Sequence, residues 1–279
     1  MSGVKITAAE VNKLRKQTGA GMMDCKKALK EAEGDFDAAI TILRKKGQKV
    51  AAKRSDREAT EGVAVAKVSD DGTQGISLVL SCETDFVAKN ADFVSFANDI
   101  ADLALANMPA DNAELATLPF NGSTVAENLI DQIGKIGEKI EVSQYEKLEG
   151  ALVVPYIHAG NKIGVLVGLN QEGNDEIVAA GKDVAMQVAA MKPIAVDENS
   201  IDEATKQKEM EIGREQARAS GRPEHILDRI AEGKLKKFYQ ENTLVHQKFV
   251  KDNSKSVKDY LNSVSKGLKV ENFKRLSIG

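Results

Sequence analysis

The first 50 residues carry apolar side chains at helical spacing, and glycine interrupts the pattern twice. Thr7 and Glu10 have the spacing of a capping box, which marks the start of a first helix. A turn at residues 19–21 and then Gly34 break the pattern, and Asp35 can cap a third helix. The apolar faces consist of Val11, Leu14 and Thr18, then Met22, Cys25 and Leu29, then Phe36, Ala39, Ile40 and Leu43. The pattern predicts a compact three-helix bundle.

A basic run follows these apolar faces. It contains Arg44, Lys45, Lys46, Lys49, Lys53, Arg54 and Arg57. No aromatic residue that could stack on a nucleic-acid base lies within the run, so we interpret it as a solvated helical linker. The bundle and this linker together form a predicted N-terminal domain at residues 1–54. Its size is close to the lower limit for independent folding, which suggests that it works with a neighbour or a partner.

The middle of the chain contains one order of elements twice. Each copy has two apolar strands separated by a short turn, followed by a helix. The strands are predicted at Val63–Val68 and Ile76–Cys82, with a helix ending before Pro109, and again at Leu152–Ile157 and Ile163–Leu169, with a helix from Ile177 to Met191. This order predicts an α+β fold with antiparallel sheets in two related core subdomains, at residues 55–140 and 141–279.

A second capping box, formed by Thr124 and Glu127, lies between the two copies. It opens a helix whose apolar side is predicted to reach Ile140, although Gly134 and Gly137 weaken it.

The C-terminal part of the chain combines a charged segment with a short apolar one. Residues 198–239 have the pattern of a helical hairpin, inserted into the second subdomain and turning at residues 219–223. Beyond it we predict strands at Leu244–Val250 and Leu268–Leu276 and a short helix at Val257–Leu261, which complete the sheet of the second subdomain.

Composition excludes several classes of function. The 279 residues include 39 Lys and Arg against 42 Asp and Glu, a net charge of −3, which argues against a direct nucleic-acid partner. Two Cys and three scattered His provide no metal-ligand set, and the chain has no phosphate-binding loop or nucleophile motif. We therefore expect no cofactor, no metal and no enzymatic activity. The hypothesis of a hydrolase that uses scattered carboxylates would rest on composition alone.

No apolar run is long enough for a membrane span, and no secretory leader is visible, so we expect a cytoplasmic protein.

The turn between the first two predicted helices has an unusual composition. Met22 and Met23 stand side by side after a glycine-flanked turn, and only Met22 falls on the apolar face. Flexible, partly exposed methionines suit a protein-contact surface. The alternative is that both side chains fill the small core.

A second segment, Glu83 to Asn90, follows an apolar strand directly. Thr84 or Asp85 can cap a short helix there. Phe86 can then either pack beneath that helix, as an aromatic residue after a strand usually does, or protrude as an anchor for a partner.

Five segments together resemble the family of bacterial translation elongation factor Ts. They are Thr18–Leu29, Thr84–Lys89, Lys135–Glu138, Tyr156–Gly164 and Glu232–Phe238, and the match is collinear over essentially the whole chain. The resemblance implies a guanine-nucleotide exchange factor that acts on elongation factor Tu in the cytoplasm. It also implies that the N-terminal bundle is similar to ubiquitin-associated domains.

The resemblance assigns roles to particular residues. The bundle would contact the nucleotide-binding domain of elongation factor Tu through Thr18, Gly19, Ala20, Gly21, Met22, Met23, Asp24, Lys26 and Lys27. The segment that dislodges Mg²⁺ from the partner would be Thr84, Asp85, Phe86 and Val87, with Phe86 entering an apolar pocket. Ile136 and His158 would be further contacts.

The implied partner is elongation factor Tu in its GDP-bound and nucleotide-free states. A homodimer through the core or the helical hairpin is also compatible with the family. The residues alone support a second hypothesis, a peptide-binding adaptor that acts through the N-terminal bundle.

Overall fold

The computed structural model describes residues 5–278, which divide into two compact units. The first unit consists of residues 5–63 and 78–145 together with residue 278, and the second consists of residues 64–77 and 146–277. The three-domain division stays a prediction.

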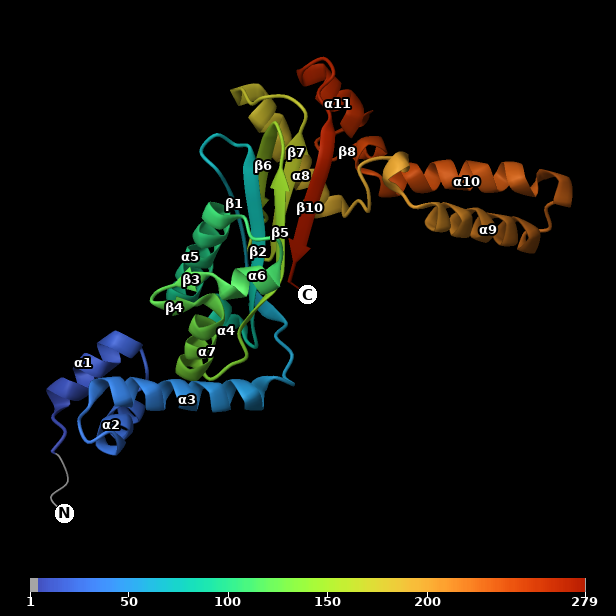
Figure 1. The fold of residues 1–279 in the computed structure, drawn as a ribbon. Helices are drawn as coiled ribbons and strands as arrows, with labels where there is room; N and C mark the ends of the chain where they lie inside the picture. The colour runs from blue at the N-terminus through green and yellow to red at the C-terminus, as the bar shows by residue number, and fades with distance from the viewer. Residues whose placement is uncertain (1–4, 279) are drawn as a thin grey trace. The chain divides into compact units, whose positions relative to one another are not determined.

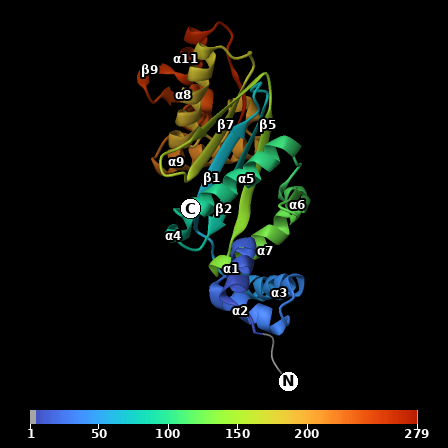
Figure 2. The same ribbon diagram turned by 90° about the vertical axis from the view of Figure 1, so that its left-hand side faces the viewer.

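The first unit begins with the expected three-helix bundle. Its helices are α1 (Ala8–Thr18), α2 (Met22–Glu31) and α3 (Phe36–Arg54), shown in Figure 2. Thr7 and Glu10 form the capping box, and Asp35 caps α3 by accepting a hydrogen bond from the amide of Ala38. The shared core consists of Val11, Leu14, Cys25, Ala28, Leu29 and Ala39. Glycine spacing and capping residues therefore located these helices correctly.

The basic run is not a separate linker. Its residues from Arg44 to Arg54 continue α3 without a break, so that α3 is a single 19-residue helix ending at Arg54 (Figure 1), and Arg57 follows the helix. Lys, Arg and Ala all have high helix propensity, and nothing before Ser55 interrupts the turn. The helical interpretation is confirmed up to Arg54, but these residues are part of the third helix and not a connector that follows it.

The rest of the first unit carries short elements around one long helix. The elements that lie wholly in this unit are α4 (Asp85–Ala88), α5 (Ala91–Asn107), α6 (Asn112–Thr117), β3 (Pro119–Phe120), β4 (Ser123–Thr124) and α7 (Val125–Ile136). Three further strands have residues in both units: β1 (Glu61–Val68), β2 (Gln74–Cys82) and β5 (Glu141–Glu149). Strands β1, β2 and β5 form one sheet in the order β1-β2-β5. Helix α5 turns its apolar side inward, where Phe96 lies 5.8 Å from the ring of Phe120.

Helix α7 is shorter than the apolar pattern indicated. Its capping box at Thr124 and Glu127 is present, but Gly137 adopts φ 83° and ends the helix after Ile136. Ile140 therefore lies beyond the helix, buried just before β5, a strand that the sequence pattern did not reveal. Gly137 ends this helix because a left-handed conformation at the C-terminus satisfies its last carbonyl groups at little steric cost.

Helices α3 and α7 pack closely against one another within this unit. A Cβ atom placed on Gly134 would lie 2.9 Å from the Cα of Gly47, which real side chains do not tolerate. The glycine that weakens α7 thus permits the close approach of α3.

The second unit contains a separate antiparallel sheet. Strands β6 (Leu152–Ile157), β7 (Ile163–Leu169) and β10 (Val270–Ser277) pair in the order β10-β7-β6, and α8 (Asp175–Met191) packs on β6 and β7. The buried side chains of α8 and of these strands share one apolar cluster, which includes Val154, Val167 and Val184. The α+β class with small antiparallel sheets is confirmed.

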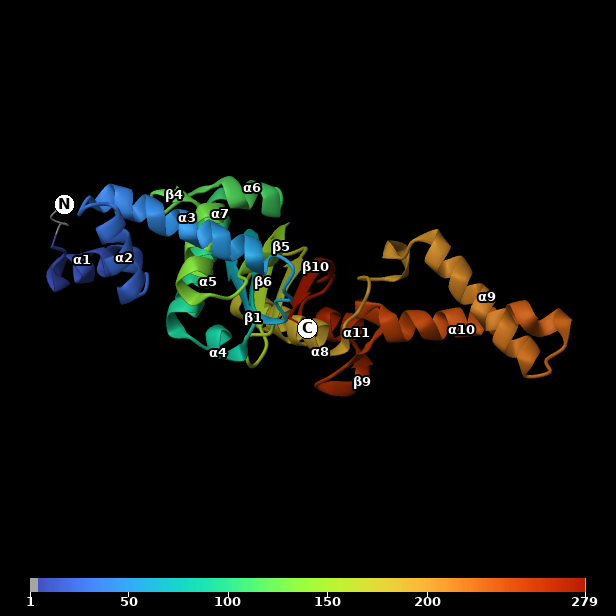
Figure 3. The same ribbon diagram turned by 90° about the horizontal axis from the view of Figure 1, so that it is seen from below.

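The predicted helical hairpin is present in the second unit. Helix α9 (Glu203–Ala219) and helix α10 (Leu227–Asn242) pack against each other, running side by side in Figure 1 and crossing in the view of Figure 3. Gly213 allows close contact with Ala231. Two short 3-10 helices, η1 (Glu198–Ser200) and η2 (Glu224–Ile226), precede α9 and α10.

The predicted strand at Leu244–Val250 is wrong. Residues Leu244–His246 form a 3-10 helix, η3, and only β8 (Lys248–Phe249) pairs, with β9 (Asp252–Ser256), in a separate two-stranded sheet. Leu244 and Phe249 are buried beside α11 (Val257–Val264) rather than in the main sheet. Strand β10 pairs with β7, as expected of the last strand.

Gly62 in β1 provides a stability test. A Cβ at this position, where φ is 152°, would lie 2.2 Å from the carbonyl oxygen of Leu80 in β2. Because the clash involves backbone, we expect Gly62→Ala to lower the free energy of unfolding by about 3 kcal/mol in urea titrations. Gly233→Ala is the matched control, since nothing lies within 4 Å of its Cβ position on α10. The control should be neutral or slightly stabilising, and equal effects of the two variants would contradict the expectation.

Candidate functional site: two exposed apolar segments of the first unit

The turn between α1 and α2 is fixed by its own hydrogen bonds. Thr18 Oγ1 donates to the carbonyl of Leu14 at 2.8 Å and accepts from the amide of Ala20 at 3.3 Å. The buried thiol of Cys25 donates to the carbonyl of Ala20 at 3.6 Å. Gly19 has φ 67°, a conformation that favours glycine. The turn therefore has a defined shape, which sets the direction in which α2 begins.

Both methionines of this turn are exposed. Met22 is 51% and Met23 is 74% exposed, so the expectation that Met22 lies in the core is wrong. Side chains of a helix lean toward its N-terminus, and Met22 is the first residue of α2. Its side chain consequently lies beyond the turn that buries Cys25 and Leu29. Together the two methionines present flexible apolar surface next to a rigid turn.

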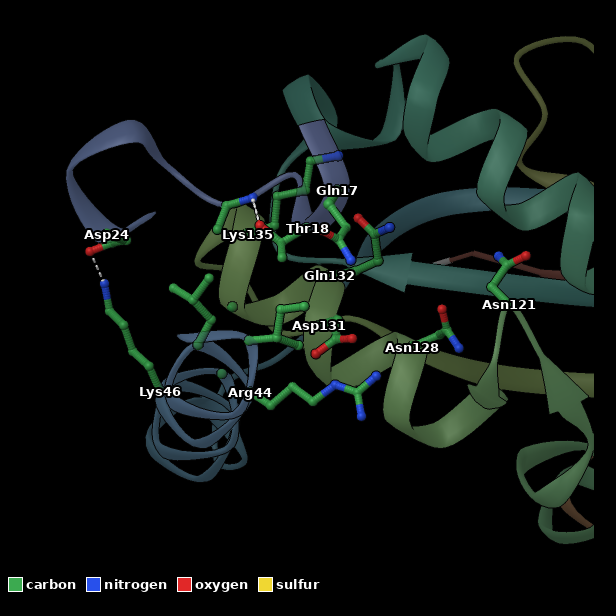
Figure 4. A pocket seen from close by; sticks show the side chains of 15 residues that line it. Gln17, Thr18, Asp24, Arg44, Lys46, Asn121, Asn128, Asp131, Gln132 and Lys135 are labelled. Atoms are coloured by element: carbon green, nitrogen blue, oxygen red, sulfur yellow. Dashed lines mark hydrogen bonds and ion pairs between the residues drawn. The ribbon is translucent and has the colours of Figure 1, made fainter. Parts of the chain in front are cut away.

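A polar pocket lies next to this turn, on the side that faces α7. A pocket of about 450 Å³ is lined by residues of α1, α3 and α7, including Thr18, Arg44 and Asp131 (Figure 4). Burial raises the pKa of Asp131, and the nearby Arg44 opposes that rise. Asp24 and Lys46 form an ion pair at the edge of the pocket. The pocket is polar and charged, unlike the exposed methionines next to it.

The second segment follows β2 directly. Thr84 caps α4, which contains only Asp85–Ala88, by accepting a hydrogen bond from the amide of Val87 at 3.4 Å. Lys89 Nζ donates to Asp85 Oδ2 at 2.6 Å, and this hydrogen bond lowers the pKa of Asp85. Phe86 is 83% exposed. The cap was predicted, and the alternative in which Phe86 packs beneath the helix is wrong.

The loop before α4 is tied down by groups that the sequence pattern did not identify. Glu138 accepts hydrogen bonds from the amides of Glu83 and Thr84, and Glu83 accepts one from the amide of Lys139. Arg54, at the end of α3, donates to both carboxylate oxygens of Glu83, at 3.1 and 2.9 Å. The exposed phenylalanine therefore stands on a loop that is held from two sides.

Residues 5–278 contain neither a cluster of metal-ligating side chains nor a helix that could span a membrane. No group of three or more metal-ligating side chains is present among them. Within the same residues, no helix is long and apolar enough to cross a membrane.

Comparison with known proteins places the chain in a family. The family model for elongation factor Ts matches residues 83–279. Proteins named elongation factor Ts from Christiangramia forsetii, Cytophaga hutchinsonii and Flavobacterium psychrophilum are each 54% identical to this chain. The alignments cover 98–99% of the chain and 99% of each relative. The chain belongs to the elongation factor Ts family. Members of this family are translation elongation factors, as the sequence resemblance implied.

The similarity to elongation factor Ts includes the N-terminal bundle. The family model begins at Glu83, but the full-length relatives also align with the bundle and its methionine turn. Both exposed segments therefore lie within the region shared with named members of the family.

Ile136 and His158, the two further candidate contacts, lie in different units. Ile136 is the last residue of α7 and is half-buried in the first unit. His158 follows β6 in the second unit, where its Nδ1 lies 3.1 Å from the hydroxyl of Tyr156. That these two residues contact a partner stays a prediction.

Proposed function

We propose that this chain is a guanine-nucleotide exchange factor that binds elongation factor Tu, promotes release of Mg²⁺ and GDP, and so allows GTP to bind. The observation that carries the proposal is the position of Phe86, which is 83% exposed on the short helix α4, directly after a loop held by hydrogen bonds to carboxylates. A large aromatic side chain exposed to water at a fixed place suits insertion into a partner.

The proposed mechanism is thermodynamic linkage. Transfer of one Phe side chain from water into an apolar pocket contributes roughly 1.5–3 kcal/mol. If Phe86 fits only the conformation of the partner that holds Mg²⁺ and GDP weakly, its binding stabilises that conformation. GDP must then weaken binding of this chain by the same factor, since coupling between two ligands is reciprocal. This chain needs neither a nucleotide site nor a metal site for such exchange.

The proposal assigns two contact regions within the first unit. The Mg²⁺-dislodging segment is Thr84, Asp85, Phe86 and Val87. The bundle contacts consist of the methionine turn and the start of α2, residues 18–24 together with Lys26 and Lys27. Ile136 and His158 add contacts outside these regions. The chain then acts in the cytoplasm by binding alone and catalyses no covalent reaction.

The function test measures release of a fluorescent GDP analogue from elongation factor Tu. Release is followed after addition of excess unlabelled GDP, with and without this chain, at a fixed Mg²⁺ concentration. We expect the chain to accelerate release at substoichiometric amounts, because it leaves once nucleotide returns. Heat-denatured chain is the control, and an unchanged release rate with the native chain would overturn the proposal.

One observation favours the second candidate function, a peptide-binding adaptor. Met22 and Met23 expose apolar surface on a bundle that could bind a partner without Phe86. A homodimer through the core or the hairpin also stays a prediction, and sedimentation equilibrium of the chain alone measures it.

A further inference from the structure

Two glutamates of the first unit each bind the backbone of the other's segment. Glu138 Oε2 accepts from the amides of Glu83 and Thr84, both at 3.1 Å, while its Oε1 accepts from the hydroxyl of Thr84 at 2.7 Å. Glu83 Oε1 in turn accepts from the amide of Lys139 at 2.7 Å. The loop after β2 and the loop after α7 are thereby joined by four hydrogen bonds to carboxylates.

The charges at this junction are partly compensated. Arg54 lies against Glu83, whose side chain is only 15% exposed, with 2.9 Å between Arg54 Nη1 and Glu83 Oε2. Burial and then the charge of Glu138 raise the pKa of Cys82 to about 12, so the thiol stays protonated. It donates to the carbonyl of Thr84 at 3.2 Å. Glu138 is stabilised mainly by hydrogen bonds from the segment that carries Phe86.

Helix α4 cannot fix the direction of Phe86 by itself. It has only four residues, and a single helical turn in water is marginal because nucleation is costly. Its cap, Thr84 Oγ1, is the same atom that donates to Glu138. The conformation of the turn therefore depends on the contact between Thr84 and Glu138.

We propose that Glu138 is a positioning residue, which holds residues 83–87 so that Phe86 protrudes in the conformation that the partner accepts. This inference rests on the proposed exchange function and deepens it. Glu138 is only partly buried, so water can replace its hydrogen bonds when it is removed. Loss of Glu138 should then loosen the loop far more than it destabilises the first unit.

The test uses two variants of the full chain and a matched control. Glu138→Ala removes all three hydrogen bonds to the loop. Glu138→Gln keeps one carbonyl oxygen for the two amides and loses the charge. Glu141→Ala is the control, because Glu141 lies three residues on and its Oε1 pairs with Lys139 Nζ at 3.2 Å. Thermal unfolding of each variant measures any general loss of stability.

Two measurements distinguish positioning from a general structural role. Hydrogen–deuterium exchange reports opening of residues 83–90 without a partner. The dissociation constant for nucleotide-free elongation factor Tu reports the fraction of chain with a competent loop, since apparent affinity falls in proportion to that fraction. This dissociation constant is measured with Phe86 intact and in a Phe86→Ala background, where we expect the bundle contacts to keep binding measurable.

We expect Glu138→Ala to raise the dissociation constant about tenfold and Glu138→Gln about threefold, as loss of charge-assisted hydrogen bonds implies. In Glu138→Ala, hydrogen–deuterium exchange at residues 83–90 should accelerate, whereas hydrogen–deuterium exchange in α1 and α2 should not. In the Phe86→Ala background, Glu138→Ala should change the constant less than about twofold, because coupled residues are not additive.

Three results would overturn the inference. The first is an unchanged rate of hydrogen–deuterium exchange at residues 83–90 in Glu138→Ala, and the second is the same fold-change in the dissociation constant with and without Phe86. The third is an effect of Glu141→Ala on the dissociation constant as large as that of Glu138→Ala. Failure of the exchange function looks different. In that case the unmodified chain neither binds elongation factor Tu nor accelerates GDP release, while the deuterium-exchange result still decides whether Glu138 holds the loop.

Discussion

Phe86→Ala should slow stimulated release of GDP from elongation factor Tu by about 10- to 100-fold at equal concentrations of the chain. Truncation removes the roughly 1.5–3 kcal/mol that burial of a Phe side chain contributes, and each 1.4 kcal/mol is a factor of ten. A central aromatic anchor commonly supplies this much of an interface. Fluorescent GDP release, measured over a series of chain concentrations, gives the change in maximal rate.

The same substitution should leave the fold unchanged. Phe86 is 83% exposed, so little packing is lost in the free chain. Phe93→Ala is the matched contrast, because Phe93 is buried on α5, and its truncation should cost about 3–5 kcal/mol of stability. A lowered melting temperature of Phe86→Ala would show that Phe86 belongs to the core, and an unchanged exchange rate would remove it from the site.

The exposure of Phe86 illustrates which features the sequence could not settle. The cap at Thr84 was predictable, because a hydroxyl at the start of a helix has a local signature. Whether an aromatic residue two positions later faces in or out depends on how the loop is held. Glu138, which holds it, lies more than 50 residues further along the chain, and periodicity describes only neighbours on one element.

Other successes and errors follow the same division. Capping boxes placed the starts of α1 and α7 correctly, but the predicted end of α7 was too late, because Gly137 ends the helix after Ile136. Strand β5 was missed, since its residues Glu141–Glu149 are polar and mostly partly exposed, without an apolar alternation. The predicted strand at Leu244–Val250 failed because Leu244 and Phe249 are buried beside α11 rather than in a ladder of the main sheet. Helix starts could be predicted from neighbouring residues, whereas the pairing of strands from distant segments could not.

Helix α3 gives the two exposed segments a common support. It forms part of the bundle core at its start, packs on α7 at Gly47, and ends at Arg54, which binds Glu83 beside the Phe86 loop. All of these contacts lie within the first unit. A rigid connection of this kind reduces the conformational freedom that two separate contacts would lose on binding.

The double substitution Met22→Ala and Met23→Ala should weaken binding to nucleotide-free elongation factor Tu about 30-fold. Each exposed methionine that becomes buried contributes about 1 kcal/mol to the free energy of binding. The two contributions add to about 2 kcal/mol, which corresponds to a change of about 30-fold in the dissociation constant. Both side chains lie outside the core of the bundle, so circular dichroism and the melting temperature should not change. Titration calorimetry of the complex measures the constant directly. Met191→Ala, at another exposed methionine, is the control and should change it less than twofold.

The pattern across the two sites separates the exchange factor from the peptide-binding adaptor. An exchange factor with two contact regions keeps part of its affinity when only the methionines or only Phe86 is changed. It loses nearly all of its affinity when the methionine substitutions and Phe86→Ala are combined. An adaptor that binds through the bundle alone loses its ligand with the methionines and is indifferent to Phe86. Loss of all binding in the methionine variant, together with an unaffected Phe86→Ala variant, would therefore replace the proposed function by the adaptor.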